Sequence, residues 1–404
     1  MRTLAEPSVA ETRPPNRTVP YFRFRPAGRE AELILQVLHS GWLTTGRMAL
    51  DFEAGFAKAV GARHALAVNS CTAALHLALE AVGVGPGQRV LVPSMTFTAT
   101  AEVVRYLGAD VVVVDVDPLT RAWTPEILDR AAAAHPEARF CMPVHYGGHP
   151  APMLAGPRGP GLLDVASRRG LTVVDDAAHA FPARLGGRAV GTFGRATCFS
   201  FYANKTITTG EGGLLVTDDD EIAARCRVMR VHGIDRDVWK RFTTPGTSWD
   251  YDVVAPGFKY NMPDVNAAIG LAQLECAEEL RLGRKAVAEA YLARLADVAA
   301  LELPAVSCEP DGHAWHLFPV MVRDGAALDR NGLSQGMSAA GIGVSVHYRP
   351  LHRMTYWRDR YGLRPEDFPG AEEAWRRSLS LPIFAGMTEE EIDHVCSALR
   401  RLLA

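Results

Sequence analysis

The stretch that decides the fold of this chain is FSFYANKTITTGEGG, residues 199–213. It starts as an apolar strand, carries a single lysine and ends in a glycine-rich turn. No other charged residue lies between Arg195 and Glu211, so Lys205 stands alone in a largely apolar environment. Burial disfavours the ammonium form and lowers the pKa of a lysine, which suits Schiff-base chemistry. A single lysine near a strand is more often a solvated surface charge, so this one needs support from elsewhere in the chain.

A second polar cluster, DDAAH at 175–179, ends the apolar run 171–174. A lysine, an acid and an imidazole at strand ends are the groups that pyridoxal 5'-phosphate (PLP) requires. The lysine forms a Schiff base, the carboxylate keeps the pyridine nitrogen protonated, and the imidazole packs on the ring. Successive strand residues point to opposite faces, so only one of Asp175 and Asp176 should face the ligand. Singly, the acids could cap a loop and His179 could be structural; together with Lys205 they favour a PLP site.

Length and composition are those of a globular protein with two domains. The chain has 404 residues, of which 48% are hydrophobic and 22% are charged, enough for a sizeable core. The formal net charge of -3 gives no electrostatic sign of nucleic-acid or membrane binding. No uninterrupted apolar run reaches the ~18 residues that span a bilayer. We therefore expect neither nucleic acid nor a membrane as a partner.

The cysteines and the N-terminal segment both favour a cytoplasmic protein. Seven cysteines are scattered without CxxC spacing, which argues for a reducing compartment and against a zinc site or a disulfide framework. We expect no bound metal. Residues 1–18 are rich in Pro, Thr, Glu and Arg and have no hydrophobic segment, unlike a secretory signal. We expect residues 1–20 to form a disordered tail.

Strand-like apolar runs alternate with helix-period segments from residue 65 to residue 217. The predicted strands are 65–68, 89–92, 110–115, 139–144, 171–175, 196–201 and 213–217, and the predicted helices are 72–82, 96–106, 125–134 and 161–169. This alternation predicts an α/β fold with a mainly parallel sheet covered by helices. Catalytic groups in such sheets lie at the carboxyl ends of strands, where Asp176 falls.

The pattern changes after about residue 262 and indicates a smaller second domain. Residues 264–296 predict a long amphipathic helix or a helix pair. The other predicted elements are strands near 316–322 and 344–348 and helices near 328–340, 372–377 and 388–403. We therefore expect a large domain at 21–262 and a small α+β domain at 263–404.

Three further segments offer cofactor contacts. The run NSCTAA at 69–74 follows a strand and opens a helix. Its backbone N–H groups at the positive end of the helix would suit a phosphate, although an ordinary N-cap would have the same composition. Phe97 is either a core residue or a stacking partner on the ring face opposite His179. Ser200 is either a strand hydroxyl or a phosphate ligand.

Histidines gather around the strands of the predicted small domain. His316, His347 and His352 occur there with Tyr348 and Arg349, and they lack the helical spacing of a metal-binding pair. They are either solvated strand edges or part of a polar substrate pocket. We take His316 and His347 as the candidate substrate residues.

With these residues in place, the chain resembles the DegT/DnrJ/StrS family of PLP-dependent sugar aminotransferases from about residue 21 to the C-terminus. The matching motifs are SGWLTTG at 40–46, SCTAALH at 70–76, Thr96-Phe97, DAAHA at 176–180, Ser200 with Lys205, EGG at 211–213 and LSLPIF at 379–384. Three segments look most like the members that make UDP-4-amino-4-deoxy-L-arabinose: PVHY at 143–146, KYNMPDVNAA at 259–268 and HAWHLF at 313–318.

The resemblance implies a fold-type-I PLP aminotransferase that works as a homodimer, and it implies roles for particular residues. Lys205 would be the Schiff-base lysine, Asp176 the partner of the pyridine nitrogen and His179 the residue packed on the ring. The other implied cofactor contacts are Cys71, Thr72 and Ser200 at the phosphate, Phe97 at the ring, and Asn261 at the phosphate of the neighbouring subunit's cofactor.

The implied reaction moves an amino group from glutamate to a keto group of a nucleotide-linked sugar, with C4 as the expected position. Arg47 stands where many family members have proline, and the loop 154–161 looks unusual, so the nucleotide and the sugar stay open. A PLP-dependent deoxysugar dehydratase is one alternative, but such members replace the lysine with histidine and this chain keeps Lys205. A non-catalytic regulatory protein of the same fold is the other, and the intact Asp176, His179 and Lys205 argue against it.

Overall fold

The structure is a computed structural model that describes residues 18–157, 159–235, 251–306, 308–309 and 311–404. The predicted tail therefore lies almost entirely outside the described residues. Its described end differs from the prediction, because Val19 is buried and its backbone pairs with Gly341 and Gly343. Val19 thus belongs to the core of the small domain, and the predicted boundary at residue 20 lies too far along the chain. None of the helices in the described ranges is long and apolar enough to cross a membrane.

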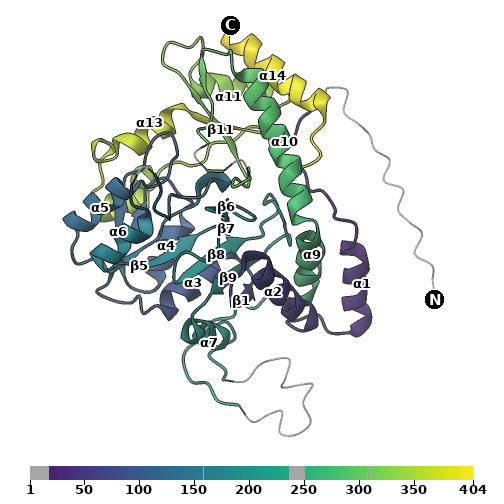
Figure 1. The fold of residues 1–404 in the computed structure, drawn as a ribbon, viewed down its shortest axis with the longest axis vertical. Coiled ribbons are helices and arrows are strands. Elements are labelled where there is room, and N and C mark those ends of the chain that lie inside the picture. Colours follow the sequence, from purple (N-terminus) through teal and green to yellow (C-terminus); the bar gives the residue numbers. More distant parts are fainter. Residues whose placement is uncertain (1–17, 158, 236–250, 307, 310) are drawn as a thin grey trace.

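Seven strands form the main sheet (Figure 1). In sheet order they are β1 (His64–Val68), β9 (Gly213–Thr217), β8 (Ala196–Ser200), β5 (Thr172–Asp176), β4 (Phe140–Cys141), β2 (Arg89–Pro93) and β3 (Asp110–Val114). Within the described chain β9 alone runs against its neighbours, and the prediction of a mainly parallel sheet is confirmed. The register pairs Asp176 of β5 with Cys198 of β8. This pairing places Asp176 beside the strand that leads to Lys205.

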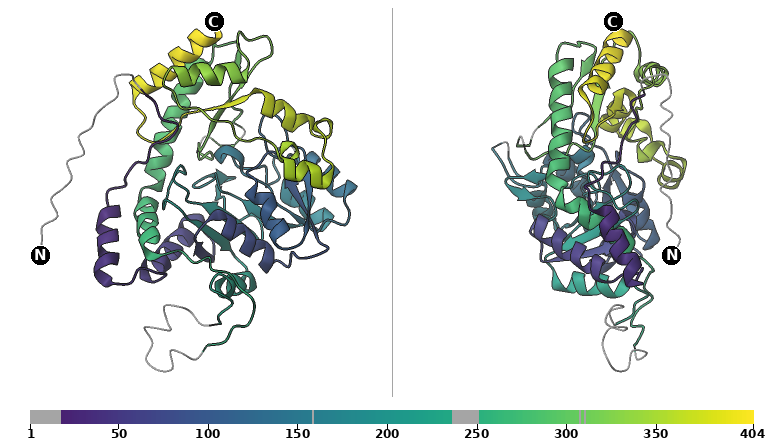
Figure 2. Two further views of the ribbon diagram at one scale, coloured as in Figure 1. Left: turned by 180° about the vertical axis from the view of Figure 1, so that it is seen from behind. Right: turned by 90° about the vertical axis from the view of Figure 1, so that its right-hand side faces the viewer.

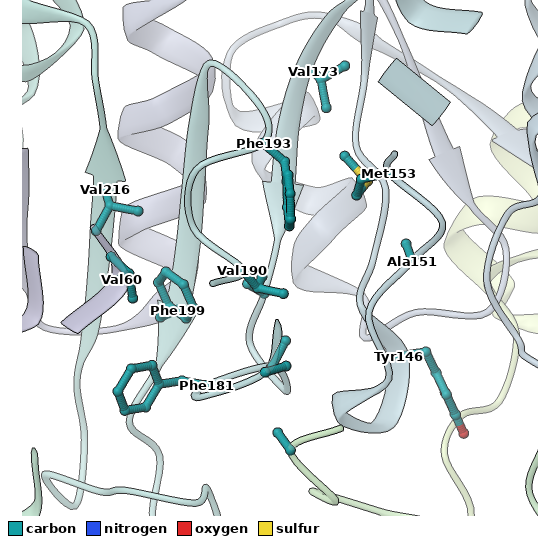
Figure 3. Packing of buried hydrophobic residues seen from close by; sticks show 14 of the residues in the cluster. Val60, Tyr146, Ala151, Met153, Val173, Phe181, Val190, Phe193, Phe199 and Val216 are labelled. Carbon is teal, nitrogen blue, oxygen red and sulfur yellow. The ribbon is translucent and has the colours of Figure 1, made fainter. Parts of the chain in front are cut away.

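Helices cover both faces of this sheet because its strands are apolar on both sides. One face carries α3 (Cys71–Ala81), α4 (Ala99–Tyr106) and α7 (Asp220–Met229); the other carries α2 (Arg47–Val60), α5 (Pro125–Ala134) and α6 (Leu162–Arg169). Side chains of β5 alternate between the layers, with Val174 on the α3 side and Val173 on the α2 side. Figure 3 shows part of the second layer, where Phe181 and Phe199 lie near Val60.

Two helices link the main sheet to the small domain. The predicted helix at 264–296 is a pair, α9 (Asp264–Glu275) and α10 (Ala277–Leu295). The shorter α9 packs against α1 (Glu30–Ser40) and α2, and α10 continues to the small domain, where it lies beside α14 (Glu389–Leu403) (Figure 2). The predicted domain division at residue 262 falls just before this pair.

The small domain holds a three-stranded antiparallel sheet. Its strands are β10 (Leu301–Glu302), β11 (Phe318–Val322) and β12 (Ser378–Leu381), and α11 (Arg330–Ala339) packs in its core. Two later helices, α12 (Thr355–Tyr361) and α13 (Pro369–Arg377), bury side chains in the two core layers of the main sheet. A two-stranded hairpin, β6 (Arg184–Leu185) with β7 (Arg188–Ala189), lies in the large domain.

The predicted strand at 344–348 is wrong. Ser345 makes only an isolated bridge to Ser380, whose strand β12 the sequence pattern did not indicate. After this bridge the chain leaves the small sheet and turns toward the large domain, where the Tyr348 N–H donates to Sδ of Met95. The backbone of this segment is therefore bonded to a distant part of the molecule, which a local alternation pattern cannot reveal.

Candidate active site

Lys205 lies in the loop after β8, facing the start of β11. The loop is closed at its ends by backbone bonds between Phe201 and Gly212 and between Thr209 and Phe201. Nζ of Lys205 lies 3.4 Å from Nε2 of His316. Burial lowers the pKa of Lys205 to about 8, while nearby acidic groups oppose that shift. The lysine thus gives up its proton more readily than a surface lysine.

Asp176 ends β5 on the α3–α4 side of the sheet, as strand alternation requires. Oγ1 of Thr100 donates to its Oδ2 at 2.7 Å, and the N–H of Ala178 donates to its Oδ1 at 3.0 Å. Burial raises the pKa of Asp176, and these two hydrogen bonds and the charge of Lys205 oppose the shift. The carboxylate is therefore fixed in orientation by donors from two different segments.

Asp175 binds a separate set of donors. Its Oδ2 accepts from the N–H of Gly194 at 3.0 Å and from Oγ1 of Thr197 at 2.9 Å. Burial raises its pKa to about 7. The expectation that only one of the two acids faces the ligand stays a prediction, and Asp176 is the acid whose charge acts on Lys205.

Hydrogen bonds fix the protonation of the His179 ring. The N–H of Gly147 can only donate, so Nδ1 of His179 accepts at 3.2 Å, and Nε2 then donates to the Tyr348 hydroxyl at 2.8 Å. Burial holds the pKa of His179 well below its usual range, and Lys205 and His347 lower it further. His179 is therefore a neutral ring, held between the 146–148 turn and the small domain.

The two candidate substrate histidines lie at different depths. The ring of His316 packs on His179 with centroids 4.4 Å apart, and His316 is the group next to the Lys205 amine. His347 lies beyond Tyr348, with its Nδ1 3.0 Å from Oγ of Ser380. Burial lowers the pKa of His347 to about 4. His316 thus contacts the Lys205 amine, whereas His347 contacts Ser380 of β12.

Two of the three proposed phosphate residues lie in the first turn of α3, and the third, Ser200, lies at the end of β8. Cys71 and Thr72 open this helix, and the Ser70 hydroxyl caps it by accepting from the Ala73 N–H at 3.1 Å. Burial raises the pKa of the Cys71 thiol, and the charges of Asp176 and Lys205 also act on it, so this turn is close to the lysine. Ser200 ends β8, and its Oγ accepts from the Tyr202 N–H at 3.3 Å.

The described contacts of Phe97 and Asn261 are with residues other than Lys205. Phe97 is 58% exposed, and its ring centroid lies 5.9 Å from that of Tyr348. Asn261 is buried, and its Nδ2 donates to Oγ1 of Thr45 at 2.7 Å while its Oδ1 accepts from Lys259. In the single chain, the Asn261 amide is therefore already hydrogen-bonded.

Three contacts of the site had no sequence signal of their own. Thr100 binds Asp176, Tyr348 binds His179, and Arg284 lies beneath the lysine loop. Thr100 and Arg284 come from helices whose patterns look ordinary. Tyr348 was singled out only as part of a polar cluster, and its partner could not be found without the fold.

The site fits PLP by the chemistry of the side chains that it gathers. A pocket beside the lysine is lined by Ala178, His179, Phe181, Ser200, Lys205, Thr206, Ile207 and His316. It offers an amine of lowered pKa and a neutral imidazole, with an oriented carboxylate and a helix N-terminus nearby. A Cβ at Gly213 would lie 2.3 Å from the carbonyl carbon of Ser70, so glycine is what allows β9 to approach this helix start.

Comparisons with known proteins agree with this reading. The model of the DegT/DnrJ/EryC1/StrS aminotransferase family matches residues 26–400. The spore coat polysaccharide biosynthesis protein SpsC of Bacillus subtilis (strain 168) is 39% identical over 96% of this chain and 98% of its own length.

Solved aminotransferases share the whole fold. Spr1654 from Streptococcus pneumoniae, assigned as a sugar aminotransferase, is 28% identical in its PMP-form, with a TM-score of 0.86 over 96% of this chain and 98% of that chain. DesV of S. venezuelae is 32% identical, with a TM-score of 0.83 over 95% of this chain and 98% of that chain. The fold is that of the type I PLP-dependent aminotransferases.

Proposed function

This chain belongs to the DegT/DnrJ/EryC1/StrS aminotransferase family, and we propose that it moves an amino group from glutamate to the C4 keto group of a nucleotide-linked sugar. Its cofactor is PLP, as in the PLP- and PMP-forms of Spr1654. One observation supports the proposal above the others. Lys205 and His179 line one pocket, and the Asp176 carboxylate lies close enough to act on the pKa of the lysine.

The proposed binding roles follow from the position of each side chain. Lys205 would hold PLP through Nζ, Asp176 would accept a hydrogen bond from the protonated ring nitrogen, and His179 would cover one ring face. The proposed phosphate contacts are Cys71, Thr72 and Ser200, with Phe97 on the open side of the ring. When bound, PLP withdraws electrons from the donor's α-carbon and so weakens its C–H bond.

The residues of the chain determine where the proton goes. The lowered pKa of Lys205, about 8, leaves part of the amine neutral near neutral pH, so Nζ can take up a proton from the donor's α-carbon. His316 holds the amine from one side, at 3.4 Å. His179 adds no charge, because burial keeps its pKa low. Lys205 is therefore the proposed acid–base group.

The sugar acceptor is supported by the relatives' names. SpsC is named for polysaccharide biosynthesis, and Spr1654 is assigned as a sugar aminotransferase. The nucleotide linkage, the C4 position and the glutamate donor rest on the resemblance of segments 143–146, 259–268 and 313–318 to the enzymes that make UDP-4-amino-4-deoxy-L-arabinose. We further propose a cytoplasmic homodimer in which Asn261 serves the partner's site. His316 and His347 remain the proposed substrate residues.

The deciding experiment is a screen of nucleotide-linked 4-keto and 3-keto sugars with glutamate as donor. We expect an amino sugar and 2-oxoglutarate in equal amounts from a 4-keto sugar, and none from Lys205→Ala. Borohydride reduction of the wild-type enzyme should attach a pyridoxyl group to Lys205, which mass spectrometry can locate. Amination of 3-keto sugars alone would reject the C4 position, and dehydration without amino transfer would favour the dehydratase alternative.

A further inference from the structure

Arg284 is a buried arginine on α10 that binds backbone carbonyls around the lysine loop. It is 5% exposed. One guanidinium nitrogen donates to the carbonyls of Trp315 (3.4 Å), His316 (3.3 Å) and Ile383 (2.9 Å), and the other donates to that of Asn204 at 3.2 Å. A single side chain therefore connects three separate segments of the chain.

No carboxylate lies within ion-pair distance of Arg284 among the residues that the structure describes. Arg281, one turn earlier on the same helix, shows the usual arrangement: it is buried but paired with Glu278 at 2.5 Å and with Asp311 at 3.6 Å. Burial of an unpaired cation is costly, and burial lowers the pKa of Arg284 to about 10. The free-energy cost of burying the Arg284 charge must therefore be offset by an interaction that a neutral side chain could not make.

The carbonyls that Arg284 binds belong to the immediate neighbours of the catalytic amine. Asn204 directly precedes Lys205, and His316 is the residue whose Nε2 lies 3.4 Å from its Nζ. Arg284 thus fixes the loop that carries the amine and the segment that contacts it. Its positive charge is also close enough to act on the charge of Lys205.

We propose that Arg284 is a positioning residue of the lysine site, one that joins the Lys205 loop to the His316 segment and, by its unpaired charge, disfavours a second positive charge on Lys205. The inference rests on the proposed role of Lys205 as the reactive amine. A neutral amine is the form that reacts with the aldehyde of PLP and that accepts a proton. Arg284 would therefore keep this form available near neutral pH.

Apart from burial, Arg284 is the group that lowers the pKa of Lys205. Asp176 of β5 and Cys71 of α3 raise the pKa of Lys205 and so favour the charged amine, whereas burial and Arg284 lower it. The rings of His179, His316 and His347 are neutral near pH 7, because burial lowers their pKa. Among the groups that act on Lys205, Arg284 is thus the permanent cation. The Asp176 carboxylate of β5 raises the pKa of Lys205, and the Arg284 guanidinium of α10 opposes this effect.

The test measures the Lys205 amine directly, without a sugar or an amino donor. The full-length protein is loaded with pyridoxamine phosphate, which leaves Lys205 free, and is labelled with acetic anhydride over a range of pH. Mass spectrometry then gives the pH midpoint of Lys205 acetylation. The variants are Arg284→Met, which removes the charge, Arg284→Lys, which keeps it, and Arg281→Met as the matched control on the same helix.

We expect Arg284→Met to raise the midpoint by about one pH unit, which leaves about tenfold less neutral amine near pH 7. Arg284→Lys and Arg281→Met should keep the wild-type midpoint. Should Arg284→Met fail to fold, Arg284→Gln carries the same expectation. An unchanged midpoint in the neutral variant, or an equal rise in Arg281→Met, would overturn the proposal. Failure of the sugar screen would not affect this measurement, so the two proposals can fail separately.

Discussion

At the scale of single residues, two neighbouring aspartates show how strand geometry assigns chemistry. Asp175 and Asp176 are both buried, yet they face different layers because side chains alternate along a strand. Thr100 orients Asp176, whereas Thr197 binds Asp175. Identical side chains therefore lie in different surroundings, because they face different layers and accept from different donors.

Asp176→Asn should keep PLP bound but slow amino transfer by about 100-fold or more. An amide cannot stabilise a protonated ring nitrogen. Its single oxygen can still accept from the N–H of Ala178, and its NH2 group can donate to the Thr100 hydroxyl, which can turn to accept. The rate of the half-reaction with glutamate, followed by cofactor absorbance, measures the loss. Asp175→Asn is the matched control and should stay near the wild-type rate. If the control were the slow variant, the two aspartates would have to exchange roles.

The pKa of Lys205 predicts how PLP attachment depends on pH. Only the neutral amine reacts with the aldehyde, and its share rises with pH through the folded-state pKa of about 8, compared with 10.5 for an ordinary lysine. The rate of PLP attachment to the cofactor-free protein should therefore fall as the pH drops below about 8. Stopped-flow absorbance measures it, with free N-acetyl-lysine as the reference. A midpoint at the pH of the reference would show that Lys205 is solvated.

At the scale of elements, the sequence predicted the strands of the main sheet but not the partners of the site residues. Buried parallel strands read as apolar runs, and the motifs at their ends are contiguous in sequence, which is why Lys205, Asp176 and the start of α3 could be named as candidates. The contacts from Thr100, Tyr348 and Arg284 come from other elements, so they depend on packing that no local pattern encodes. Strand β12 was missed because half of its residues are serines, Ser378 and Ser380, which are polar in sequence although the fold buries them.

Gly213→Ala should weaken cofactor binding by displacing the start of α3. The added Cβ would lie 2.3 Å from the carbonyl carbon of Ser70 and 2.4 Å from the nitrogen of Cys71, and neither backbone atom can move freely. Such overpacking costs about 1–3 kcal/mol. Urea unfolding and PLP titration measure the two effects. Gly85→Ala, where a Cβ meets nothing within 4 Å, should change neither. Wild-type PLP affinity in Gly213→Ala would show that the start of α3 does not bind the phosphate of PLP.

At the scale of the whole molecule, the site is completed where the small domain meets the large one. A Cβ at Gly148, whose φ is positive, would lie 2.9 Å from the nitrogen of His316 and 3.0 Å from the carbonyl oxygen of His179. This glycine lets the 146–148 turn fit between the two histidines. The lysine, from one domain, and its neighbour His316, from the other, are thus held together by close backbone packing.

The largest-scale prediction is that Asn261 acts across a homodimer interface. Its Nδ2 already donates within its own chain, to Oγ1 of Thr45 at 2.7 Å and to Oγ1 of Thr44 at 3.4 Å, so a phosphate of the partner's cofactor would have to replace the longer of these two bonds. Mixing Asn261→Ala subunits with Lys205→Ala subunits tests this. In a mixed dimer both lesions would fall in one site and leave the other intact, so heterodimers should recover about half of wild-type activity per dimer.

The control for this mixing experiment pairs Lys205→Ala with Asp176→Asn. Both residues are proposed to serve the site of their own subunit, so every site in that mixed dimer carries one lesion and no activity should return. Mass spectrometry of intact dimers confirms that subunits have exchanged. If Asn261→Ala with Lys205→Ala stays as inactive as the control after exchange, Asn261 serves its own subunit. Its bonds to Thr44 and Thr45 would then be structural and would hold the segment before α9 against the segment before α2.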